Sequence, residues 1–133
     1  MNNKLKALFA PAAAAMAIAA TPAAHANRVV GQQVVVSSTG SPCTHRACAK
    51  SAWVEALVPP GATIRAIRTM TTANYPDDRA HPTEIPAGAD IGWSEFSTPE
   101  TWYDASGAAH IRAQYWNRSH NRSRVVQIVV DFE

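Results

Sequence analysis

The 133-residue sequence lacks the motifs of several common enzyme classes. It contains no Gly-x-Ser-x-Gly nucleophile elbow, no His-Glu-x-x-His zinc motif and no glycine-rich phosphate loop. Beyond the first twenty residues, no stretch is long and apolar enough to form a transmembrane segment. No window holds a sustained apolar repeat of helical spacing. These absences favour a binding protein over an enzyme and an all-β fold over a helical one.

Residues 1–26 have the pattern of a secretory signal peptide. Lys4 and Lys6 give a positively charged start, an apolar, alanine-rich stretch follows over residues 7–20, and Ala-His-Ala provides small residues at a cleavage site. The sequence therefore predicts an exported protein, periplasmic or extracellular, with a single domain over residues 27–133.

The charge of the predicted domain is close to neutral. Without Lys4 and Lys6 its basic residues number ten, which equals the ten acidic residues. A neutral domain has no overall field that would attract nucleic acid, so we expect no nucleic-acid partner.

Cysteine is scarce, and both cysteines lie in the predicted domain. Cys43 and Cys48 are close in sequence, and an oxidising compartment favours a disulfide between them. His45 lies between them and raises the alternative of a zinc or copper site. A closed zinc site needs four ligands and the chain has no second Cys/His pair, so we expect a disulfide, no metal and no other cofactor.

The domain alternates short runs of Val, Ile, Thr and aromatic residues with stretches of Pro, Gly, Ser, Asn and Asp. This pattern predicts a small antiparallel β-sandwich of six to seven strands. Two seven-residue segments, 58–64 and 85–91, share a Pro-x-Gly-Ala turn that should carry the chain between sheets. The expected strands are 28–37, 52–58, 63–71, 90–96, 108–117 and 124–132.

The last two predicted strands can be joined as a hairpin. A turn at His120 and Asn121 sets Asn117 opposite Arg124. In that register one face is apolar in both strands, and the other face is mixed. The apolar pairs are Tyr115 with Val126, Ala113 with Ile128, Ile111 with Val130 and Ala109 with Phe132.

Aromatic residues give the first candidate ligand site. Trp102 follows a polar segment in a predicted loop over residues 97–107, and flat rings beside carboxylates and amides suit a sugar. The alternative is that Trp102 is a core plug; Trp53 and Trp93 are expected in the core. The candidate ligand-binding residues are Trp102, Tyr103, Asp104, Trp116, Gln114 and Gln127.

Cationic residues at the predicted hairpin tip give the second candidate. Arg118, His120, Arg122 and Arg124 have no acid among them, and arginine matches the geometry of phosphate, sulfate and carboxylate. The tip would contact an anionic glycan, lipopolysaccharide or an acidic partner protein. The alternative is a solvated tip that keeps the strand edges apart.

We therefore predict a non-enzymatic, exported binding module with a carbohydrate-like or cell-surface ligand. The main alternative is a protein-interaction or inhibitor-type module that uses the C-terminal hairpin and its arginine tip. A third reading is a small secreted hydrolase with Glu95 and Glu100 as its carboxylates.

Overall fold

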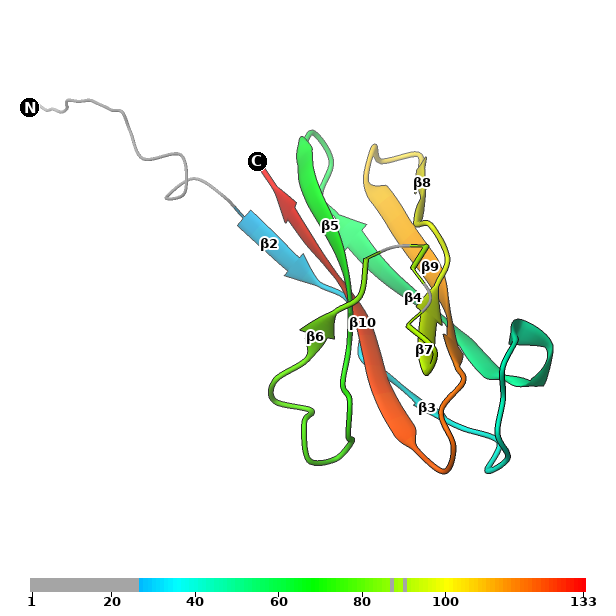
Figure 1. Cartoon of the computed structure of the whole chain (residues 1–133). Helices are drawn as coiled ribbons and strands as arrows, with labels where there is room; N and C mark the ends of the chain where they lie inside the picture. The colour runs from blue at the N-terminus through cyan, green and yellow to red at the C-terminus, as the bar shows by residue number, and fades with distance from the viewer. Residues whose placement is uncertain (1–26, 87, 90) are drawn as a thin grey trace, which may run out of the picture.

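The computed structural model describes residues 27–86, 88–89 and 91–133. These residues form two antiparallel sheets packed against each other (Figure 1), which confirms the predicted all-β sandwich. The predicted signal peptide, residues 1–26, lies outside the described residues. Within the described ranges no helix is long and apolar enough to cross a membrane.

The first sheet has five strands and is built around the C-terminal strand. Its order is β2-β10-β5-β6, and β3 also pairs with β10 beyond the end of β2. Its strands are β2 (Asn27–Val30), β3 (Val34–Ser37), β5 (Ile64–Thr71), β6 (Thr83–Glu84) and β10 (Ser123–Phe132).

The second sheet has four strands and is built around β9. β4 pairs along one side of β9, and β7 and β8 pair one after the other along its other side. Its strands are β4 (Lys50–Val58), β7 (Ser94–Phe96), β8 (Glu100–Tyr103) and β9 (Ala109–Asn117).

The two Pro-x-Gly-Ala turns carry the chain between the sheets, as predicted. The first joins β4 of the four-stranded sheet to β5 of the other, and the second leads from β6 back to β7. Gly61 and Gly88 both have a positive φ, which glycine adopts without steric cost.

The predicted C-terminal hairpin is wrong. β10 pairs with β2, β3 and β5, whereas β9 pairs with β4, β7 and β8, so the two strands belong to different sheets. Of the two predicted turn residues, only Asn121 has a positive φ, of 49°. The segment after Asn117 therefore bridges the sandwich instead of folding back within one sheet (Figure 1).

The residues predicted on the apolar face of that hairpin nevertheless form the core. Side chains from β9 and β10 meet between the sheets, together with Val54, Ala56 and Val58 of β4 and Phe96 of β7. The buried face of each strand was predicted correctly, because the same face is buried whether a partner lies beside it or across the core. The predicted mixed face is wrong for β10, where Val125, Gln127 and Val129 are buried as well. The fully buried side chains of the two strands are Ile111, Ala113, Tyr115, Val126, Ile128 and Val130.

Four segments differ from the expected strands. The predicted strand 28–37 is interrupted between β2 and β3, the strand predicted over 90–96 begins only at Ser94, β6 was not predicted, and the predicted loop 97–107 contains β8. The interruption coincides with Gly31, whose amide donates to the Ile128 carbonyl at 2.7 Å. A Cβ at Gly31 would lie 2.4 Å from the backbone oxygen of Glu55 in the other sheet. Only glycine lets the two sheets approach this closely.

Gly31→Ala should therefore destabilise the protein by about 1–3 kcal/mol, the usual cost of forcing extra atoms into a packed site. Urea unfolding monitored by tryptophan fluorescence measures the change. Gln32→Ala, at the exposed neighbour, is the control and should leave the free energy of unfolding nearly unchanged. Equal stability of the two variants would contradict the close approach at Gly31.

Candidate binding surface

The outer side of the four-stranded sheet carries exposed aromatic and charged side chains. Because successive residues of a strand point to opposite faces, the residues between the core positions of β4 and β9 face outward. The register aligns Leu57, His110 and Trp102 in one row across the sheet, and aligns Glu55, Arg112 and Glu100 in the next. We call this surface the aromatic face; it consists of Trp53, Glu55, Leu57, Glu100, Trp102, His110, Arg112 and Gln114.

Trp102 lies flat on His110. The two rings stack with centroids 3.8 Å apart and planes within 5°, and Trp102 is 46% exposed. The alternative of a core plug is therefore wrong. His110 is itself held on both sides, since Nδ1 lies 2.9 Å from Glu55 and Nε2 lies 2.8 Å from Asp104. The Trp102 indole therefore stacks on an imidazole whose orientation is fixed by two carboxylates.

Asp104 lies in the turn between β8 and β9 and orients the His110 imidazole. Its Oδ1 accepts hydrogen bonds from the backbone amides of Ser106 and Ala108 and from the Ser106 hydroxyl, and Oδ2 contacts His110. The Ser106 hydroxyl and His110 hold the pKa of Asp104 well below its usual range. These hydrogen bonds fix the turn from β8 to β9 and hold Asp104 against His110.

Trp53 is the second exposed indole of the aromatic face. The prediction that it lies in the core is wrong, because it is 45% exposed. The Arg112 guanidinium lies over its ring at 4.4 Å, and the same arginine pairs with Glu100 at 3.3 Å. Trp93, by contrast, is half-buried and packs against the core, as expected.

Trp116 lies away from solvent, although the sequence suggested an exposed ligand contact. Cys43 and Cys48 form the predicted disulfide, and the short loop between them, with the 3₁₀ turn η2 (Arg46–Cys48), covers this end of the sheet. Arg46 stacks on the Trp116 ring at 3.9 Å and pairs with Glu95 at 2.7 Å. Only 9% of Trp116 remains exposed.

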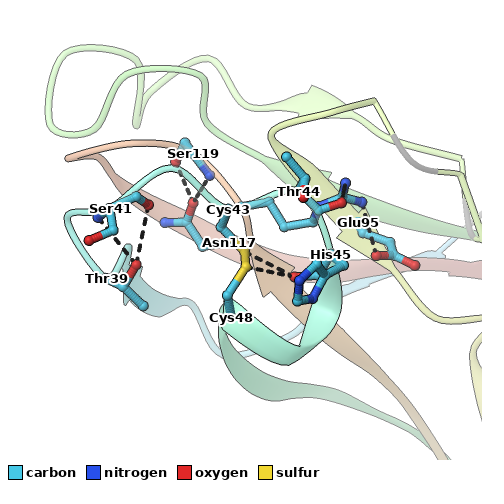
Figure 2. The surroundings of a disulfide bond; sticks show 10 residues. Thr39, Ser41, Cys43, Thr44, His45, Cys48, Glu95, Asn117 and Ser119 are labelled. Atoms are coloured by element: carbon cyan, nitrogen blue, oxygen red, sulfur yellow. Dashed lines mark hydrogen bonds and ion pairs between the residues drawn. A yellow bond between two sulfur atoms is a disulfide. The ribbon is translucent and has the colours of Figure 1, made fainter.

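The disulfide loop is also tied to the connection between β9 and β10 (Figure 2). Arg118 donates to the backbone oxygen of Thr44 and contacts Glu95 at 3.5 Å. Asn117 Oδ1 accepts hydrogen bonds from the amide and hydroxyl of Ser119. The hydrogen bonds of Asn117 order the β9–β10 connection, and the contact between Arg118 and Thr44 joins that connection to the disulfide loop.

The predicted cationic tip is divided by these contacts. Arg118 is largely buried by its contacts with the disulfide loop, and Arg124 is buried with its guanidinium over Trp93 at 4.2 Å. Burial lowers the pKa of Arg124. Only His120 and Arg122 are exposed, so a four-residue cationic cluster is not present.

The remaining predicted ligand residues do not share one surface. Gln114 belongs to the aromatic face and donates to the Ser51 hydroxyl at 3.3 Å, but Gln127 is buried in the other sheet. Tyr103 is 66% exposed, yet as the neighbour of Trp102 in β8 it points to the opposite face. Of the predicted set, Trp102 and Asp104 come together at His110, and Gln114 lies on the same face of the sheet, beside Trp53.

Sequence reasoning missed Trp53, Glu55 and Leu57. The signal was present in β4, where Trp53, Glu55 and Leu57 alternate with the buried Val54, Ala56 and Val58. Within the described ranges no group of three or more His, Cys, Asp or Glu side chains is placed to hold a metal ion.

Comparison with protein-family models, curated protein sequences and solved structures gives no match to this chain.

The contribution of His110, on which Trp102 stacks, to the free energy of unfolding should depend on pH. Contacts with Asp104 and Glu55 raise the pKa of His110, so its protonated form stabilises the folded state. That contribution is complete below the unfolded-state pKa of about 6.5 and is lost as pH rises through the higher folded-state pKa. The free energy of unfolding should fall over this range.

Urea unfolding at several pH values measures this fall, and His110→Gln should make the dependence shallower. Retention of the full pH dependence in His110→Gln would contradict the role given to His110.

Proposed function

We propose that the aromatic face binds carbohydrate. The observation that carries the proposal is an exposed indole, Trp102, held flat against an anchored imidazole, His110. A sugar ring offers an apolar face for stacking and hydroxyls for hydrogen bonds. Trp102 offers the surface for stacking, and Glu55, which contacts His110, offers a carboxylate close to it. Gln114 offers an amide farther along the same face, beside Trp53.

Rigidity supports this proposal. A side chain that is already fixed loses little conformational entropy when ligand binds, so more of the stacking energy contributes to affinity. Both exposed indoles meet this condition, because Trp102 stacks on His110 and Trp53 lies beneath Arg112.

The spacing of the two indoles suggests an extended ligand. Trp102 is aligned with His110 and Trp53 with Gln114, four residues farther along β9 and on its other side. From the usual strand dimensions the two positions are about 17 Å apart. A ligand that covers both rings is therefore a chain of sugars.

A protein partner is the second candidate, and Leu57 favours it. This leucine is 53% exposed and lies in the same row as His110 and Trp102. Together with the exposed tryptophans this leucine forms an apolar patch, and exposed apolar patches mark protein-interaction sites.

Trp102→Ala should weaken polysaccharide binding at least tenfold, about 1.4 kcal/mol or more, while the melting temperature stays nearly unchanged. A panel of soluble polysaccharides in affinity electrophoresis identifies a ligand, and calorimetry then compares the variants. Trp53→Ala should weaken long ligands more than short ones.

Tyr103→Ala is the matched control, because it removes an exposed aromatic ring from the same strand but from the opposite face. It should bind like the unchanged protein. Full binding by Trp102→Ala, or no binding of any polysaccharide by the unchanged protein, would contradict the carbohydrate proposal and leave the protein partner.

A further inference from the structure

A polar pocket of about 360 Å³ lies where β3 meets the start of β10. It belongs to the end of the five-stranded sheet, so it is separate from the aromatic face on the other sheet. No carboxylate is found among the described residues that line it. The lining residues are Ser37, Ser38, Asn121, Arg122 and Ser123.

Backbone and side-chain bonds fix the two walls of this pocket to each other. The Ser38 amide donates to the Arg122 carbonyl at 2.8 Å, and the Arg122 amide donates to Ser38 Oγ at 3.0 Å. Ser37 and Ser123 are register partners, and their hydroxyls lie 2.8 Å apart. The buried Asn117 side chain also joins the two walls, because its Nδ2 donates to the carbonyls of Val36 and Arg122.

The pocket offers hydrogen-bond donors to a ligand. Ser38 Oγ accepts the Arg122 amide, so its own hydroxyl proton can point into the pocket. The Ser37 and Ser123 hydroxyls use one proton between them and retain one. The exposed Arg122 guanidinium donates to the Asn121 carbonyl at 3.2 Å and has further N–H groups on its fork.

We propose that this pocket binds a tetrahedral oxyanion, a sulfate or phosphate group carried by a larger molecule. Arginine provides charge and two parallel donors for two of the oxygens, and the serine hydroxyls face the others. A volume near 360 Å³ is at the lower end of the range for small-molecule sites, about 300–1,000 Å³, and leaves room beside the anion.

The test is an NMR titration of the purified protein with sodium sulfate and, separately, with sodium phosphate, with chloride holding the ionic strength constant. The amides of residues 37–38 and 121–123 should shift and reach saturation with at least one of the two anions. The arm that saturates at lower concentration identifies the preferred group.

Arg122→Gln should weaken this binding at least tenfold without changing the melting temperature, because the side chain is exposed and the backbone bonds remain. Arg65→Gln is the matched control, since it removes the same charge at the far end of β5, where Arg65 pairs with Glu133. It should titrate like the unchanged protein.

Three results would overturn the proposal: shifts that never saturate with either anion, undiminished binding by Arg122→Gln, or an equal loss of binding in Arg65→Gln, which would indicate a general charge effect.

Discussion

The structure depends on the packing of β9 against β10 across the core. Each strand buries alternate residues completely, and these side chains fill the space between the sheets. Burial of one face of β9 leaves its other face free, with β4 and β8 on either side. The aromatic face is therefore the outer side of the same strand whose inner side holds the sandwich together.

Much of the fold can be predicted from alternation, but strand partners cannot. Ile111, Ala113 and Tyr115 read as one buried face, and the structure confirms it. The same alternation fits a neighbour in one sheet or a neighbour across the core, so it could not distinguish a hairpin from two sheets. The Pro-x-Gly-Ala turns were more informative, because their geometry disfavours a tight hairpin.

The candidate site was only partly predictable, because contacts distant in sequence decide exposure. Trp116 is covered by Arg46 of the disulfide loop, and Arg118 is held by Thr44 of that loop. Neither contact leaves a local pattern. Trp102 was identified because it lies among polar residues. The exposure of Trp53 also follows from the sequence, because Trp53 alternates with buried residues in β4, but this alternation was overlooked.

Backbone NOEs in the isotope-labelled protein test the central claim most directly, namely that β9 and β10 face each other from different sheets. The account predicts cross-strand NOEs between Ile128 and Thr69 and between Ala113 and Val54. Backbone NOEs between Ala113 and Ile128 would instead place the two strands side by side. That result would contradict both the sandwich described above and the aromatic face derived from it.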